Sequence, residues 1–223
     1  MHNLIIISDL HLRDGSVADT FTNERACIDL LLAYKNDIIV LNGDIFDISY
    51  TQSLPIIENT YPRLCDVIAR YVTFIARGNH EAFLRTACNQ YLYSQIQVDG
   101  IRIKHGHDYD ALNHGSLAWA GDFVTWATGK IDRYIYRDFT EDIGGVVFRM
   151  LRQGKFGDLE RYRRFALDTI SRDGTIDSLV LGHTHIKEVR PELRYWNTGC
   201  WVRGHTDVLI IPVSSNPVVR LWE

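Results

Sequence analysis

Side chains that commonly bind metal ions gather in five short polar segments of the sequence. Each segment follows an apolar run, and together they hold six of the nine histidines. The segments are 9–11 (D-L-H), 42–47 (N-G-D-I-F-D), 78–81 (G-N-H-E), 105–108 (H-G-H-D) and 182–185 (G-H-T-H). Ligands of open α/β sheets collect at the carboxyl ends of the strands. If the apolar runs are strands, the five segments therefore converge in space.

The residue types in these segments predict a site for two metal ions. Carboxylate, imidazole and amide ligands suit Mn²⁺, Fe²⁺ or Zn²⁺, and none of the segments contains a cysteine. The seven candidate ligands are Asp9, His11, Asp44, Asn79, His105, His183 and His185. Seven are too many for one tetrahedral ion. They suit two ions roughly 3.5–4 Å apart that share a carboxylate, which is typical of phosphoester hydrolysis. We expect Mn²⁺, with Fe²⁺ or Zn²⁺ as alternatives.

Alternating apolar runs and helical patterns predict a parallel sheet in the first third of the chain. The expected strands cover residues 4–8, 37–42 and 71–76, and the expected helices cover residues 21–34 and 55–71. Ser53 suits the N-cap of the second helix, because Pro55 then falls in its first turn. This order of elements predicts parallel strands with helices on the faces of the sheet.

The remaining sequence predicts further strands around a helical insertion. Asp99-Gly100 suits a type I′ turn, which predicts a hairpin that returns through residues 101–104. Residues from about 111 to 172 are expected to be helical, since they contain no proline. Short β-like segments follow at 178–181, 193–196, 207–213 and 218–222. Residues 1–223 are therefore expected to form one α/β domain with the insertion at about 111–172.

The composition is typical of a globular protein in an aqueous compartment. Hydrophobic residues make up 46% and charged residues 23%, and no apolar run approaches the roughly 18–20 residues that span a bilayer. The formal net charge of −4 argues against a broad nucleic-acid-binding surface. The start of the chain lacks the features of a signal peptide, and the four cysteines form no C-x-x-C pair. We therefore expect a cytoplasmic protein with reduced thiols.

The motif series D-x-H, G-D-x-x-D, G-N-H-E, H-G-H and G-H-T-H resembles that of the calcineurin-like metallophosphoesterase superfamily. The motifs extend from Asp9 to His185, so the resemblance covers most of the chain. It implies a four-layer α/β/β/α sandwich, in which the hairpin and the late strands supply the second sheet. It also implies two ligand sets bridged by Asp44, namely Asp9, His11, Asp44 and His185 for one ion and Asp44, Asn79, His105 and His183 for the other.

The same resemblance implies a hydrolytic mechanism. Two cations would lower the pKa of a water between them, and hydroxide would attack phosphorus in line with the leaving oxygen. His80 would stabilise or protonate that oxygen, and Glu81 would orient the imidazole. Asp47 is expected to support the ligands rather than to bind a metal ion itself. His107 is expected either to touch the substrate or to make an ordinary hydrogen bond.

Two features of the insertion bear on the substrate. Trp119, Phe123 and Trp126 share one face of the expected helix. That face either packs on the sheet or on a second copy of the chain, or forms an apolar lid for an acyl chain or a membrane surface. Between residues 149 and 164, basic residues exceed acidic ones, which would recruit a phosphorylated ligand or an anionic membrane, unless they form a solvated helix face. We name Arg149 and Arg152 as candidate substrate contacts.

These features predict metal-dependent hydrolysis of a phosphoester in a small-molecule or lipid-linked substrate. The start I-S-D-L-H-L, the insertion and segment 195–201 (Y-W-N-T-G-C-W) also resemble UDP-2,3-diacylglucosamine pyrophosphohydrolases of lipid A synthesis. Those enzymes usually carry Arg where this chain has His80, which places it nearer the general phosphatases and phosphodiesterases. A nuclease and a non-catalytic scaffold are further alternatives, although a scaffold would be expected to lose ligands that this chain keeps.

Overall fold

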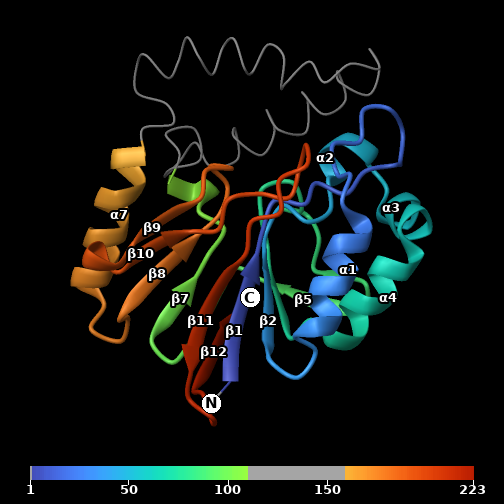
Figure 1. Ribbon diagram of the computed structural model, residues 1–223. Helices are drawn as coiled ribbons and strands as arrows, with labels where there is room; N and C mark the ends of the chain where they lie inside the picture. The colour runs from blue at the N-terminus through green and yellow to red at the C-terminus, as the bar shows by residue number, and fades with distance from the viewer. Residues whose placement is uncertain (1, 110–158) are drawn as a thin grey trace.

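Two six-stranded sheets form the centre of the molecule, which we describe from a computed structural model (Figure 1). The structure describes residues 2–109 and 159–223. The first sheet has the strand order β11-β1-β2-β3-β5-β4, and the second has the order β12-β6-β7-β8-β10-β9. The predicted α/β class is confirmed.

Parallel strands from the first third of the chain form most of the first sheet. They are β1 (His2–Ile7), β2 (Ile38–Asn42), β3 (Phe74–Ala76) and β5 (Gln90–Tyr93). In the register of β1 and β2, Leu4 lies opposite Ile38. Ile, Val and Leu dominate the central strands because both faces of this sheet are covered. Antiparallel strands complete the sheet, with β11 (Leu209–Val213) beside β1 and β4 (Thr86–Ala87) beside β5.

The second sheet is built around the predicted hairpin. β6 (Gln95–Val98) and β7 (Ile101–Ile103) are antiparallel. Asp99 and Gly100 between them both have positive φ, as a type I′ turn requires. The other strands are β8 (Ser178–Leu181), β9 (Glu188–Arg190), β10 (Tyr195–Asn197) and β12 (Val219–Trp222). Because β7 and β8 are parallel neighbours, the loops that follow them leave the sheet at the same edge.

Helices cover the outer face of each sheet, which gives four layers. α1 (Glu24–Ala33), α3 (Leu54–Thr60) and α4 (Pro62–Tyr71) lie beside the first sheet, and α7 (Leu159–Arg172) lies beside the second (Figure 1). Three clusters of buried apolar side chains fill the three gaps between the layers. The predicted α/β/β/α sandwich is therefore confirmed. The short helices are α2 (Ile48–Thr51), η1 (His107–Tyr109) and η3 (Pro191–Leu193).

The prediction of one helix over residues 55–71 is wrong, because two helices occupy that segment. The break falls at Tyr61, which has φ −118° and ψ 52° and directly precedes Pro62. Proline disfavours the α conformation of the residue before it and cannot donate a helical hydrogen bond. Ser53 is the N-cap residue of α3, but its side chain makes no capping hydrogen bond. The third strand is shorter than predicted, because α4 includes Tyr71.

Only the end of the predicted insertion falls within the described residues. There α7 packs on the second sheet through buried apolar side chains. The rest of the insertion lies outside the described residues, and with it Trp119, Phe123, Trp126, Arg149 and Arg152. Among the described helices, none is long and apolar enough to cross a membrane.

Candidate metal centre

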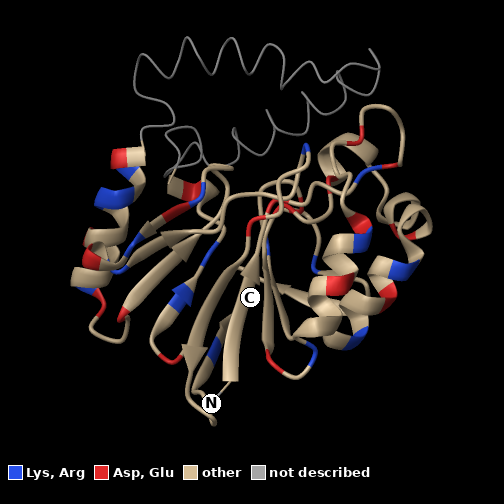
Figure 2. Ribbon diagram, in the orientation of Figure 1, with Lys and Arg blue, Asp and Glu red and all other residues tan. Residues whose placement is uncertain are grey.

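The five polar segments meet at one edge of the sandwich. They follow strands β1, β2, β3, β7 and β8. Backbone hydrogen bonds join them directly, since His11 N donates to Asp44 O (2.9 Å) and Gly182 N donates to His105 O (2.9 Å). Figure 2 shows acidic residues in the loops above β1 and β2. The fold therefore brings together segments that are far apart in the sequence.

Asp9, His11 and His185 form the first cluster of ligand atoms. His11 Nε2 lies 3.1 Å from His185 Nε2. Asp9 Oδ1 lies 3.2 Å from His185 Nε2 and 3.9 Å from His11 Nε2. Ser8 Oγ and His183 N donate hydrogen bonds to the other oxygen, Asp9 Oδ2. The protein thus holds one Asp9 oxygen in place and turns the other toward both imidazoles.

Asp44, His105 and His183 form the second cluster. Asp44 Oδ2 lies 3.0 Å from His105 Nε2 and 3.9 Å from His11 Nε2 of the first cluster. His105 Nδ1 lies 2.8 Å from Asn42 O, which can only accept, so Nδ1 carries a proton and Nε2 faces the centre. One carboxylate oxygen therefore lies between the two clusters.

Several buried polar atoms at this centre make no hydrogen bond of good geometry within the described residues, although two of them lie close to charged side chains. Asp9 Oδ1, Asn79 Oδ1 and His105 Nε2 make no hydrogen bond within the part of the chain that the structure describes. Such atoms are rare, because burying a polar group without a partner is costly. The two clusters with the nearby oxygen of Asn79 offer carboxylate, imidazole and amide donors, which fit divalent transition-metal ions.

Electrostatics at the centre favours a positive charge beside Asp44 and a neutral imidazole at His11. Burial lowers the pKa of His11 to about 3, and neighbouring His80 adds to the effect. Burial also opposes the charged form of His105, but the Asp44 and Asp9 carboxylates outweigh it and raise the pKa of His105 to about 10. Burial disfavours the Asp44 carboxylate, yet His105 and the other imidazoles hold its pKa well below the usual range. Such a carboxylate attracts cations.

Five of the seven predicted ligands have a left-handed backbone conformation. The φ angles are 56° for Asp9, 50° for His11, 52° for Asp44, 67° for His183 and 54° for His185. The left-handed region costs an L-residue roughly 1–2 kcal/mol. Strain of this kind persists where the surrounding structure imposes it, and it clusters at functional sites. Other non-glycine residues, such as Gln52, Cys88 and Arg194, share this conformation away from the centre. The five left-handed residues therefore support the assignment of the centre but do not identify it alone.

Two glycines allow the loops to approach the ligands closely. A Cβ atom at Gly43 would lie 2.6 Å from the His105 ring, and the φ of Gly43 is +80°. A Cβ atom at Gly78 would collide with the side chain and the backbone nitrogen of Asp44. Only a residue without a side chain fits at these two positions.

His80 lies beside the metal centre and is held by Asp47. His80 Nδ1 lies 2.7 Å from Asp47 Oδ1 and 2.8 Å from Ser49 Oγ. Its other nitrogen, Nε2, lies 3.9 Å from Asp44 Oδ2. Burial opposes protonation of His80, but the Asp47 and Asp44 carboxylates raise its pKa to about 9. This arrangement keeps a proton on Nδ1 and directs Nε2 toward the centre as a hydrogen-bond donor.

The sequence predicts that Glu81 orients the His80 imidazole, but no hydrogen bond joins these two side chains within the described residues. Glu81 instead accepts backbone N–H bonds from Asp44, Ile45, Phe46 and Gly78. These four donors occupy both oxygens of the carboxylate, so that Glu81 joins the loop after β2 to the loop after β3. Asp47 takes the place at the imidazole that the prediction gave to Glu81.

His107 lies next to the second cluster. Its ring centroid is 5.6 Å from that of His105 and 6.4 Å from that of His183. Its buried Nδ1 has no hydrogen-bond partner within the described ranges. Burial, with a contribution from His105, lowers the pKa of His107 to about 3. A neutral imidazole with an unpaired nitrogen therefore borders the centre.

Two further groups of ligand-type side chains occur among the described residues. One is His11, Asp47 and His80, which overlaps the first cluster, and the other lies in the loop after β10. Cys200, His205 and Asp207 place ligand atoms within 4.8 Å of one another. However, Lys187 Nζ lies 3.5 Å from Asp207 Oδ1 and already supplies a positive charge there. This group therefore differs from the main centre, where no lysine or arginine pairs with Asp9 or Asp44 among the described residues.

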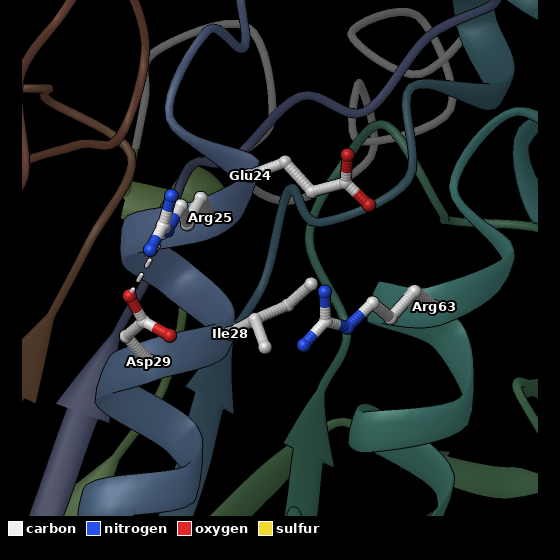
Figure 3. Close-up of a pocket in the computed structure, with 5 residues that line it drawn as sticks. All are labelled: Glu24, Arg25, Ile28, Asp29 and Arg63. Carbon is white, nitrogen blue, oxygen red and sulfur yellow. Dashed lines mark ion pairs between the residues drawn. The ribbon is translucent and has the colours of Figure 1, made fainter.

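A cavity of about 260 Å³ lies on the helical face, between α1 and α4 (Figure 3). Its lining residues are Glu24, Arg25, Ile28, Asp29 and Arg63. Arg25 pairs with Asp29 at 3.8 Å, as Figure 3 shows. None of the lining residues belongs to the ligand clusters, so this cavity is separate from the metal centre.

Sequence reasoning missed several residues that support the ligands from behind. Ser8 Oγ lies 2.5 Å from Thr198 Oγ1, and Asn197 Nδ2 donates to Gly182 O at 2.8 Å. Asn197 ends β10 and Thr198 follows it, so polar residues at the end of a further strand were the available signal. Arg13, which is only 4% exposed, pairs with Asp47. No pattern in the sequence indicated that pair.

Residues 2–208 match the model of the calcineurin-like phosphoesterase family. No curated protein matches the chain. One similar solved structure is a conserved protein of Streptococcus pneumoniae TIGR4, described as a predicted phosphoesterase, with 13% identity, a TM-score of 0.41 and coverage of 99% of this chain and 97% of that chain. Another is the cold-active protein-tyrosine phosphatase of a psychrophilic Shewanella species, with 14% identity, a TM-score of 0.42 and coverage of 94% and 75%. A third is the calcineurin-like phosphoesterase YfkN from Bacillus subtilis, with 12% identity, a TM-score of 0.41 and coverage of 90% and 81%.

Proposed function

The chain belongs to the calcineurin-like phosphoesterase family, and we propose from this premise that it hydrolyses a phosphoester by means of two divalent cations. The family supports metal-dependent phosphoester hydrolysis, and the His and Asp clusters fit metal ions. The number of ions, Mn²⁺ as the metal and the role of each residue belong to the proposal. The proposed ligands are Asp9, His11, Asp44, Asn79, His105, His183 and His185.

The position of Asp44 is the single observation that supports this proposal most directly. Its Oδ2 lies 3.0 Å from His105 Nε2 in one cluster and 3.9 Å from His11 Nε2 in the other. A carboxylate shared in this way suits a pair of ions roughly 3.5–4 Å apart. Its backbone is held by Glu81, and Gly78 leaves it room, so the loops around Asp44 are shaped to fix that oxygen.

Different side chains have different roles in the proposed hydrolysis. When bound, two cations supply positive charge that lowers the pKa of a water and stabilises the phosphoryl oxygens. Asp9 and Asp44 each keep one oxygen in hydrogen bonds to the protein and present the other to the centre. His80, fixed through Nδ1 by Asp47, uses Nε2 to donate a hydrogen bond or a proton to the leaving oxygen.

We propose a phosphorylated small molecule or a lipid-linked phosphate as the substrate. His80 stands where UDP-2,3-diacylglucosamine hydrolases usually carry Arg, so we place the lipid A precursor second. The proposed contacts are Arg149 and Arg152, which lie in the basic part of the predicted insertion, outside the described residues. We propose that they help to recruit the phosphorylated substrate.

An activity panel tests the proposal. Metal-depleted protein is reloaded with Mn²⁺, Fe²⁺ or Zn²⁺ and assayed on a generic phosphomonoester, a generic phosphodiester, a cyclic nucleotide and a UDP-sugar lipid. We expect no hydrolysis without metal and the highest rate with Mn²⁺ on at least one of the four. The Asp9→Asn variant serves as the control for contaminating phosphatases and should be inactive. Full activity in a chelated sample, or the same activity in Asp9→Asn, would contradict the proposal.

A further inference from the structure

Arg13 is a buried arginine whose charge is used inside the protein. Its side chain is 5% exposed, and its Nε lies 2.8 Å from Asp47 Oδ2. One guanidinium nitrogen donates to Ala18 O at 2.6 Å, and the guanidinium carbon lies 4.6 Å from the centre of the Tyr50 ring. A guanidinium enclosed in this way is not placed to bind a substrate phosphate in solvent.

The two oxygens of Asp47 have different partners. Oδ1 lies 2.7 Å from His80 Nδ1 and also accepts hydrogen bonds from Ser49 Oγ (2.5 Å) and Tyr50 N (3.1 Å). Oδ2 accepts the hydrogen bond of Arg13. A carboxylate bound at both oxygens cannot rotate about its own axis, so the direction of Oδ1 toward the imidazole is fixed from behind.

Another group competes for Asp47 Oδ2. His11 Nδ1 lies 4.0 Å from that oxygen, and its Nε2 faces the metal centre. If Arg13 were absent, Asp47 Oδ2 would lose its only full positive charge among the described ion pairs. Oδ1 would keep its hydrogen bonds from Ser49 and Tyr50. Oδ2 would lose the bond that fixes the plane of the carboxylate, so that plane would turn toward His11 and weaken the bond of Oδ1 to the His80 imidazole. Removing one partner of a buried charge pair leaves the other uncompensated.

We propose that Arg13 is a positioning residue, which orients Asp47 so that His80 Nε2 faces the leaving oxygen. The inference rests on the proposed function for the role of His80. The orientation of the His80 imidazole itself is a property of the protein that can be measured without substrate. Residues that support metal ligands from behind typically change activity by about 10–100-fold when they are replaced. We expect a loss of the same size from Arg13, which supports His80 through Asp47 in a similar way.

The first test measures the His80 ring in metal-free protein by NMR. The Nδ1 proton, bonded to Asp47, should give a downfield signal that exchanges slowly with water and disappears in His80→Asn. We expect Arg13→Gln to shift this signal and to speed its exchange, and Arg13→Lys to restore part of the protection. An unchanged signal in Arg13→Gln, or no such signal in the wild type, would overturn the proposal whether or not the protein is an enzyme.

Arg102→Gln is the matched control. Arg102 also makes a 2.8 Å ion pair, with Asp173, and lies over an aromatic ring, that of Trp222. Its loss should lower the melting temperature without altering the His80 signal. If Arg102→Gln changed that signal as much as Arg13→Gln does, the effect would be general destabilisation, and the proposal would be wrong.

The second test uses Mn²⁺-loaded protein and two phosphomonoesters, p-nitrophenyl phosphate and an alkyl phosphate with a poor leaving group. Arg13→Gln should lower kcat for the alkyl ester by about 10–100-fold, lower it less for the nitrophenyl ester, and leave KM unchanged. In a His80→Asn background the same substitution should have no further effect on kcat. If kcat fell equally on both esters, or if Arg13→Gln lowered kcat just as much in the His80→Asn background, Arg13 would not act through His80. Inactive wild-type protein with a normal NMR result would instead count against the proposed function alone.

Discussion

His11 Nε2 and His185 Nε2 lie 3.1 Å apart, although 174 positions separate the two residues in the chain. Burial lowers the pKa of His11 to about 3, so its imidazole is neutral at physiological pH. Two imidazole nitrogens that face each other beside the Asp9 carboxylate are arranged as ligands of one cation. Because β1 and β8 belong to different sheets, the pair also shows how the sandwich assembles the centre from both of its halves.

Replacement of His80 should separate catalysis from metal binding. We expect His80→Asn to lower kcat by roughly 10²–10⁴-fold, the usual contribution of a positioned proton donor. The metal content should stay normal, because His80 Nδ1 bonds to Asp47 and the ring is not among the proposed ligands. Metal analysis and steady-state kinetics on the same preparation check both statements. A loss of metal equal to that of Asn79→Ala would make His80 a ligand.

Glu81→Gln should lower the stability of the loops that Glu81 joins, rather than disturb the proposed proton donor, His80. The carboxylate accepts four backbone N–H bonds, and an amide would turn its own NH₂ group against some of these donors. A buried polar group left without a partner costs about 1–3 kcal/mol, so the free energy of unfolding should fall by about that amount. Chemical denaturation measures this loss of stability. The control is Glu24→Gln, a change at the cavity of Figure 3. Unchanged stability would contradict the structural role that we assign to Glu81.

Gly78→Ala should weaken metal binding, because the new methyl group would meet Asp44. The nearest atoms are the side chain and the backbone nitrogen of Asp44, and backbone cannot move aside cheaply. Gly174→Ala offers a control, since nothing lies within 4 Å of a Cβ atom there. Calorimetric titration with Mn²⁺ should show a lower affinity for Gly78→Ala alone. Wild-type affinity in Gly78→Ala would mean that the position of Asp44 matters less than we infer.

The parallel strands and their convergence could be predicted because they depend on local patterns. Runs of Ile, Val and Leu with polar residues at their ends follow directly from burial on both faces of the sheet. The very short strand β4 (Thr86–Ala87) and the strand β5 (Gln90–Tyr93) carry no such run, and they were not predicted. β5 pairs with β3, and β4 pairs with β5, so both strands depend on tertiary contacts rather than on propensity.

The contacts of the carboxylates could not be predicted in the same way. Asp47 and Glu81 are both acidic and both lie close to His80 in space, so residue type alone does not decide which one bonds to the imidazole. The backbone N–H groups of the loop after β2 decide it, because they occupy both oxygens of Glu81. The partner of Asp47 on its other side, Arg13, comes from the first loop. Such pairings depend on coordinates that only the folded chain provides.

Metal stoichiometry of the wild type and of Asp44→Ala is the most direct test of the account. Its central claim is that one carboxylate joins two ligand clusters, since Asp44 Oδ2 lies within 3.9 Å of His11 Nε2 and 3.0 Å of His105 Nε2. Elemental analysis after loading with Mn²⁺ and gel filtration should find about two ions per wild-type chain. It should find almost none in an Asp44→Ala variant that circular dichroism shows to be folded. A single ion in the wild type, or one ion kept at full affinity in the variant, would contradict the shared site.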